Sequence, residues 1–293
     1  METIRDKEFG GERPLFGTRG LHLENVTFHA GESALKCCAD IEAEKCRFEG
    51  KYPFWHTDGF KVRNSLFTPG ARAALWYSRN LEMTDTQVDA PKMFREMDGI
   101  VLRNVNIPDA EETLWHCANV DIRDVKVANA DYLFMHSHDI RIENWHQQGN
   151  YSFQYCRNVE IRNAEIHSKD AFWGTENVTI YDSVISGEYL GWHSRRLHLV
   201  RCRISGTQPL CYCRDLVLED CVFEEDCDLA FEDSEVNAIL LSPVTSVKNP
   251  MRGSITAETI KEIIIDGFSK AVEPVKICLL YTSPSPRDRT RSR

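Results

Sequence analysis

Short stretches of alternating apolar and polar residues recur every 19 to 21 residues along most of the chain. The clearest copies are residues 158–176 and 177–195, and each opens with two apolar residues on either side of a polar one. This spacing is typical of a strand with one buried face, and its regular recurrence predicts a repeat architecture. The paired apolar positions are, in order, Leu21/Leu23, Ile41/Ala43, Phe60/Val62, Leu81/Met83, Ile100/Leu102, Val120/Ile122, Ile140/Ile142, Val159/Ile161, Val178/Ile180, Leu197/Leu199 and Leu216/Leu218.

Each copy also contains two positions that favour a change of chain direction. Two residues after the second apolar position, nine of the eleven copies carry Asn or Asp, as at Asn144 and Asn163. A second position rich in Gly, Asn and Asp precedes the next copy, as at Asn158 and Asn177. Because Asn and Asp tolerate the left-handed backbone conformation and bond to the local backbone at bends, we expect a corner at both positions.

Between the two corners, the sequence predicts a second short strand and then a third. The second strand carries an apolar column that includes Phe28 and Ile166, and the third carries Leu114 and Phe172. Three strands and about three bends in some 20 residues make one turn of a β-solenoid, here called a rung. Helical repeats of this length would show a 3.6-residue period instead.

We therefore predict an all-β, right-handed parallel β-helix of about eleven rungs at residues 21–233, with rungs stacked about 4.8 Å apart. Residues 1–20 and 234–277 are expected to cap its two ends against edge pairing. Within the second cap, the β-branched run from Ile263 to Ile265 favours strands, although Ala257 to Ile265 is also compatible with a short helix.

The repeat resembles the single-stranded right-handed parallel β-helix of the pectin-lyase-like fold. The rung openings of the form NVxIxN, a column of W-H/Y-S sequences and the segment from Ser246 to Asp266 are also similar to a bacterial family known only as a domain of unknown function. The resemblance implies the fold. It implies no activity, and no catalytic residue is transferred from it.

The last sixteen residues call for a separate interpretation. Cys278 to Asp288 reads CLLYTSPSPRD and resembles the translation of a sequencing adaptor rather than a protein sequence. We interpret residues 278–293 as an adaptor-derived artefact and exclude them from the fold prediction.

Composition and charge narrow the cellular setting. The start of the chain lacks the apolar stretch of a signal peptide, and no apolar run approaches the roughly 18 residues that span a bilayer, so we expect no membrane association. Eleven cysteines at repeat positions suggest buried thiols in a reducing cytoplasm rather than a disulfide framework. The net charge of −10 argues against a nucleic-acid partner.

Candidate chemistry gathers on the predicted third strand. Five of the six tryptophans fall in the register that follows its apolar column. Strand alternation predicts that this register faces solvent, where aromatic rings would stack on sugars or dock a protein. Alternatively, an arm or a second subunit covers the column, or these residues lie in the core. The candidate ligand-binding residues are Trp55, Trp76, Arg95, Trp115, Trp173 and Trp192.

The next register is rich in histidine and tyrosine, and it adds His116, His136 and His193 to the candidate ligand-binding residues. Adjacent rungs would place His116 and His136 within about 5 Å, close enough to share a metal or a proton. Alternatively, the histidine and tyrosine side chains form hydrogen bonds with a neighbouring column of hydroxyl side chains. Because no Cys/His metal motif is present, we predict neither a metal nor a cofactor. The hydroxyl column contains Ser78, Ser137, Thr175 and Ser194.

Carboxylates offer a weaker catalytic hypothesis. Asp58 and Asp98 lie two rungs apart, a separation of about 10 Å that is at the limit for an inverting glycosidase, and Glu96 lies near them. Arg79 falls between the two aspartates, so a surface ion ladder is the simpler interpretation. No phosphate-binding glycine loop or nucleophile elbow accompanies them.

Three classes of function follow. The chain binds a carbohydrate or glycan fragment on its aromatic strand, serves as a structural or protein-interaction solenoid, or acts on a polysaccharide through Asp58, Glu96 and Asp98. We favour binding over catalysis, with an oligosaccharide or a protein as partner. The repeat gives no indication of the oligomeric state.

Overall fold

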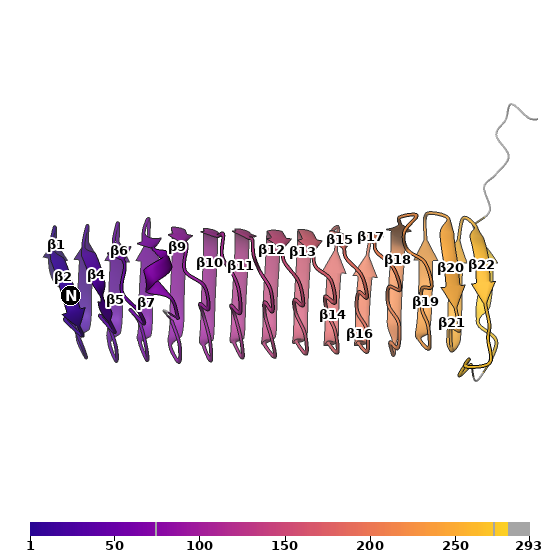
Figure 1. Cartoon of the computed structure of the whole chain (residues 1–293), viewed down its shortest axis with the longest axis horizontal. Helices are drawn as coiled ribbons and strands as arrows, with labels where there is room; N and C mark the ends of the chain where they lie inside the picture. Colours follow the sequence, from indigo (N-terminus) through magenta and orange to yellow (C-terminus); the bar gives the residue numbers. More distant parts are fainter. Residues whose placement is uncertain (74, 272, 281–293) are drawn as a thin grey trace, which may run out of the picture.

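The computed structural model, which describes residues 1–280 except 74 and 272, is a straight parallel β-solenoid (Figure 1). One ladder of parallel strands runs along its whole length and defines fifteen rungs of the described residues. These first strands are β1 (Glu2–Arg5), β3 (Arg19–Glu24), β5 (Ala39–Glu44), β7 (Asp58–Arg63), β9 (Arg79–Val88), β10 (Asp98–Ile107), β11 (Ala118–Val127), β12 (His138–Gln148), β13 (Arg157–His167), β14 (Glu176–Tyr181), β16 (Arg195–Val200), β18 (Leu216–Phe223), β19 (Glu235–Leu240), β21 (Arg252–Ala257) and β23 (Lys276–Leu279).

A second ladder follows the first around a corner. In the middle rungs both ladders belong to one bent strand, because β9 to β13 continue through the corner, and β18 does the same. The remaining second strands are β2 (Glu8–Glu12), β4 (Thr27–Glu32), β6 (Arg47–Phe48), β8 (Leu66–Phe67), β15 (Val184–Ser186) and β17 (Arg203–Ser205), with the separate parallel pair β20 (Val244–Lys248) and β22 (Ile260–Ile264) near the C-terminal end.

Both predicted corners are confirmed. Asn144 and Asn163 have φ of 55° and 52°, and Asn158 and Asn177 have φ of 55° and 58°. All four are therefore left-handed, as the Asn and Asp columns predicted. Their amides also bond between rungs, as from Asn144 Nδ2 to Asp124 Oδ1 at 2.7 Å.

The expected count of about eleven rungs is wrong, because both end segments also form rungs. Residues 2–12 pair in parallel with β3 and β4, and the C-terminal segment adds β19, β21 and β23. The first rung escapes the sequence pattern because a terminal rung has one open side and needs fewer apolar residues, as the exposed β1 shows. The last rungs escape it because their spacing departs from 19 to 21 residues, with 17 residues between the paired Val236 and Gly253 and 22 between Ser254 and Lys276. The segment from Ala257 to Ile265 contributes to β21 and β22, so strands replace the alternative helix.

The C-terminal strand β23 includes residues that we predicted to be an adaptor-derived artefact. These are Cys278 and Leu279, which pair with Thr256 and Ala257 of β21. Leu280 of the same predicted segment is described as well, and its amide donates to the Ala257 carbonyl at 2.8 Å. Residues 281–293 of that segment lie outside the described residues. No helix in the described part of the chain is long and apolar enough to cross a bilayer.

The core consists of columns of like residues stacked along the axis. Phe134, Phe153 and Phe172 are fully buried, and their rings stack with centroids 4.6 and 4.8 Å apart. The sixth tryptophan, Trp145, lies in the same interior, 5.9 Å from Phe134. Nine of the eleven cysteines are buried as predicted, whereas Cys37 is exposed and Cys278 is half-buried.

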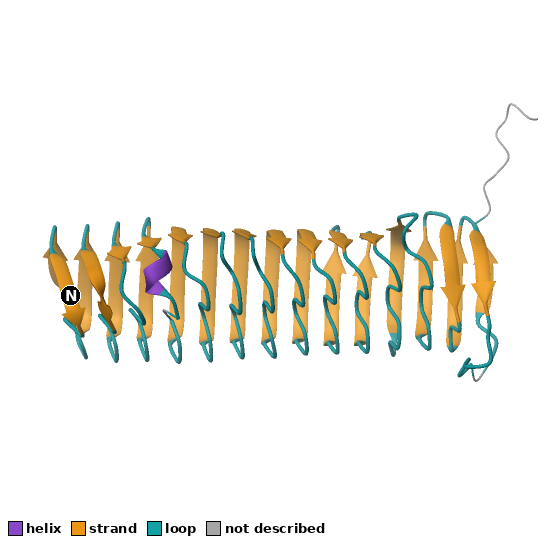
Figure 2. Cartoon of the chain, in the orientation of Figure 1, coloured by secondary structure: helices purple, strands orange, loops and turns teal. Residues whose placement is uncertain are grey.

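The predicted third strand is wrong. In its place each rung has a return segment, the chain between the end of one second strand and the start of the next first strand, which is drawn as a loop crossing in front of the strands in Figure 2. In the return segments that follow β9 to β18, alternate residues are left-handed, as at Tyr151, Phe153 and Tyr155 with φ of 60°, 59° and 58°. In the earlier return segments only the outer two of these three positions are left-handed, as at Ser33 and Cys37. A β-strand requires negative φ at each position.

Candidate functional site

The tryptophan register of the return segments is half-buried rather than fully exposed. Along one segment Leu114 is buried, Trp115 half-buried, His116 exposed and Cys117 buried again, so burial does not alternate as in a strand. Three of the indoles, those of Trp76, Trp115 and Trp192, also bond to the backbone of the following return segment, as from Trp76 Nε1 to the Lys92 carbonyl at 2.8 Å. The six candidate residues of this register are thus partly packed against the rod.

Arg95 is held within this register by its neighbours. Its guanidinium lies 4.9 Å from the Trp76 ring and 4.1 Å from the Trp115 ring, and it forms an ion pair with Glu112. Lys92 Nζ contacts the same carboxylate at 3.0 Å. The positive charge of Arg95 is therefore compensated inside the protein.

The neighbouring register forms stacked ladders of aromatic rings. His116 and His136 stack with centroids 5.2 Å apart, confirming the predicted proximity, and Tyr155 lies 4.9 Å beyond His136. His193 and Tyr212 form a second stack at 4.9 Å. Each ring covers the face of the next, so the ladder presents mainly ring edges to solvent.

The surroundings of this ladder change the pKa of one of its histidines. Burial, together with the neighbouring His116, lowers the pKa of His136 below its usual value. No group of three or more candidate metal ligands occurs in the part of the chain that the structure describes. The hydroxyl column behind the ladder bonds to carbonyls of the backbone, as from Ser137 Oγ to Leu114 at 2.7 Å and from Ser194 Oγ to Phe172 at 2.8 Å.

Two of the three candidate carboxylates, Asp58 and Asp98, are engaged by neighbours. Asp58 lies 3.3 Å from Arg79 Nε and accepts from Asn80 at 2.8 Å, and Asp98 accepts from Asn119 at 2.6 Å. Asp58, Arg79 and Asp98 occupy one column on three successive rungs, as the ion-ladder interpretation predicted. Glu96 is exposed in the ring-ladder register.

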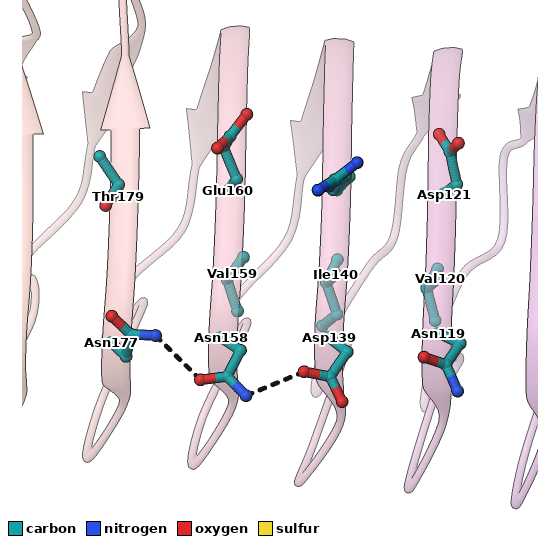
Figure 3. A pocket seen from close by; sticks show the side chains of 11 residues that line it. Asn119, Val120, Asp121, Asp139, Ile140, Asn158, Val159, Glu160, Asn177 and Thr179 are labelled. Atoms are coloured by element: carbon teal, nitrogen blue, oxygen red, sulfur yellow. Dashed lines mark hydrogen bonds between the residues drawn. The ribbon is translucent and has the colours of Figure 1, made fainter.

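A groove that the sequence did not reveal lies over the first strands β11 to β14 (Figure 3). It encloses about 590 Å³ and crosses four rungs. Its floor is the outer face of the strands, because the side chains of Val120, Ile140 and Val159 are buried in the core. Its polar groups come from the corner column and from the outward column of the strands. We call it the first-strand groove, and its lining residues are Asn119, Val120, Asp121, Asp139, Ile140, Arg141, Asn158, Val159, Glu160, Asn177 and Thr179.

The corner side of the groove is a chain of hydrogen-bonded amides and a carboxylate. Asn177 Nδ2 donates to Asn158 Oδ1 at 2.9 Å, and Asn158 Nδ2 donates to Asp139 Oδ1 at 2.8 Å (Figure 3). Hydrogen bonds from His138 and Asn158 lower the pKa of Asp139, so its carboxylate stays ionised near neutral pH. The groups are fixed before any ligand arrives.

The opposite side of the groove carries charges of both signs. Arg141 stands in register between Asp121 and Glu160 on the adjacent rungs. Both acids bond elsewhere, Asp121 to Arg103 at 2.9 Å and Glu160 to Arg162 at 3.1 Å. The Arg141 guanidinium makes no ion pair with any other described residue, which leaves its donors available in the groove.

The sequence did contain the signal for this groove. The corner column and the outward column between the paired apolar residues carry Asn, Asp and Arg on consecutive rungs, which brings planar polar groups together on the outer surface.

Known structures similar to this chain are only distantly so. The surface adhesin PfbA of Streptococcus pneumoniae is 8% identical over 89% of this chain and 81% of its own, with a TM-score of 0.34. The A-module of the mannuronan C-5 epimerase AlgE4 of Azotobacter vinelandii is 10% identical over 97% and 90%, with a TM-score of 0.33. The catalytic domain of a GH87 alpha-1,3-glucanase is 9% identical over 95% and 64%, with a TM-score of 0.24.

These similarities are too distant to support an argument about activity. No functionally curated protein matches the chain. A protein-family match, in contrast, extends over residues 2–278, nearly the whole solenoid. The expected kinship with a domain of unknown function is thereby confirmed: the chain belongs to the family described as "Protein of unknown function (DUF3737)".

Proposed function

We propose that this protein binds an extended, uncharged oligosaccharide in the first-strand groove. The observation that carries the proposal is the line of planar polar groups from the corner column and the outward column along four consecutive rungs. Carboxylates accept hydrogen bonds, guanidinium groups donate them and amides do both, so together they match the hydroxyl groups of a sugar chain.

The groove is better suited to this task than the aromatic face on which the sequence focused attention. Sugar rings stack on the open faces of aromatic side chains. Here neighbouring rings cover those faces, as between His116 and His136, and Trp76 and Trp115 are covered by Arg95. The aromatic face therefore exposes mainly ring edges to a sugar, whereas the first-strand groove exposes hydrogen-bond donors and acceptors.

Preorganisation supports the same conclusion. The bonds from Asn177 to Asn158 and from Asn158 to Asp139 already hold these side chains in one arrangement. Binding then loses less side-chain entropy than it would on a surface of free side chains. Arg141 is the exception, since no ion pair with a described residue holds its guanidinium before a ligand arrives.

A glycan array followed by calorimetric titration of the best neutral oligosaccharide tests the proposal. Arg141→Ala should weaken binding roughly tenfold, because it removes charged hydrogen-bond donors from the groove. Arg203→Ala is the matched control, since Arg203 is an exposed arginine of β17 that pairs with Glu224 on a different ladder. Tyr155→Ala, on the ring ladder, should leave the affinity unchanged.

Two outcomes contradict the proposal. If no neutral oligosaccharide binds, the solenoid functions as a structural or protein-interaction element instead. If Tyr155→Ala abolishes binding and Arg141→Ala does not, the ligand lies on the aromatic face.

A further inference from the structure

One histidine on the second strands connects a hydroxyl group and a carboxylate. His167, the last residue of β13, has its Nδ1 hydrogen-bonded to Ser186 Oγ. Its Nε2 lies 2.8 Å from Glu165 Oε1. Serine, imidazole and carboxylate are therefore joined in one chain of hydrogen bonds.

The chemistry of the end groups fixes the direction of each hydrogen bond. Hydrogen bonds from His167 and from His146, whose Nδ1 lies 3.3 Å from Glu165, lower the pKa of Glu165. An ionised carboxylate only accepts, so His167 Nε2 carries the proton. Nδ1 of the neutral imidazole then accepts, and Ser186 donates its hydroxyl proton to it.

The fold holds these three residues rigidly. Glu165 and His167 flank the buried Ile166 on β13, so both side chains point outward on the same face of the strand. Ser186 ends β15 and pairs with His167 in the parallel register. Strand pairing thus determines the approach of hydroxyl to imidazole.

The chain of hydrogen bonds is open to solvent between two surface hollows. His167 lines both, and Ser186 lines one of them together with Gly187, which places no side chain beside the hydroxyl. Glu188 in that hollow is paired with Lys169 at 3.3 Å, whereas Asp109, Glu111 and Asp131 leave the hollow with a net negative charge that disfavours an anionic substrate.

We propose that Ser186 is an activated nucleophile that accepts the acyl group of a small uncharged carboxylic ester, with His167 as general base and Glu165 as positioning residue. Ser186 Oγ bonds to the carbonyl carbon while its proton passes to His167 Nδ1. The bond from carbon to the ester oxygen then breaks, and His167 returns the proton to the departing alcohol. Water, activated by His167, releases the carboxylic acid and regenerates Ser186.

Labelling of the full-length protein with a fluorophosphonate, read by intact mass and peptide mapping, tests this proposal, and p-nitrophenyl acetate provides a turnover assay. Ser186 should be labelled. His167→Ala should slow the labelling roughly 100-fold, the usual contribution of a general base. Circular dichroism of each variant confirms that it folds.

Two further variants test the positioning role of Glu165 and the specificity of labelling for Ser186. Glu165→Gln should slow labelling and move its pH profile to lower pH, because the imidazolium loses its carboxylate partner, whereas a purely structural role would leave the profile in place. Ser205→Ala should have no effect, since Ser205 pairs in register with Ser186 on the next rung and lies beyond His167. Absence of label on Ser186, or equal rates in wild type and His167→Ala, would overturn the proposal.

Discussion

The two halves of each rung, the strands and the return segment, are held in place by different interactions. In the strand half, backbone hydrogen bonds between rungs are regular, and β12 contains left-handed residues only at its two corner positions, Asp139 and Asn144. In the following return segment, Tyr151, Phe153 and Tyr155 are all left-handed, at about 1–2 kcal/mol for each residue with a side chain. Backbone pairing therefore defines the strand half, whereas side-chain packing must offset the conformational cost of the return half.

The largest expected effect comes from removing that packing. Phe153→Ala takes one ring out of the stack with Phe134 and Phe172 and should lower the free energy of unfolding by about 3–5 kcal/mol. Phe60→Ala, at a buried phenylalanine of the strand half, should cost a similar amount. Denaturant-induced unfolding measures both.

Substitution by glycine should affect the return half and the strand half differently. Phe153→Gly should be more stable than Phe153→Ala by about 1 kcal/mol, because glycine adopts the left-handed conformation freely. Phe60→Gly should instead be less stable than Phe60→Ala, by about 0.5–1 kcal/mol. Gly191, with φ of 70°, already occupies the column of Phe153 two rungs away. The same order of stability at both sites would refute the distinction.

This contrast also explains what the sequence could predict. The corners were predictable because Asn144 and Asn158 belong to columns in which one residue type has one backbone conformation. The return segment was not predictable, because Leu114, Trp115 and His116 resemble part of a strand in which buried and exposed residues alternate. The missed signal was the three-residue spacing between two buried positions, Leu114 and Cys117. The first-strand groove depends on residues such as Arg141 that the repeat does not constrain, so periodicity alone could not identify it.

A hydroxyl group replaces part of the regular backbone pairing in the return half, and its loss should have an intermediate effect. Ser137 Oγ accepts from the Cys117 amide at 2.9 Å and donates to the Leu114 carbonyl at 2.7 Å, in a buried position. Ser137→Ala leaves that amide without an acceptor and should destabilise the protein by about 1–3 kcal/mol.

Ser137→Cys is the matched control for this change. Cys156 fills the same column one rung later, and its Sγ donates to the Phe134 carbonyl at 2.6 Å. The cysteine variant should therefore retain more stability than the alanine variant in the same unfolding assay. Equal losses would mean that the hydrogen bond contributes little and that the column is held by packing alone.

The smallest expected effect is a pH dependence confined to the ring ladder. Burial and the neighbouring His116 lower the pKa of His136, so the folded protein favours the neutral imidazole. As pH falls below about 6.5, the usual value for histidine, the unfolded chain binds the proton first and stability declines. The decline ends once the folded protein is protonated as well. His136→Phe should keep the stack and flatten this part of the profile of unfolding free energy against pH. An unchanged slope in that variant would show that the other histidines, and not the stacked ladder, set the pH dependence of the fold.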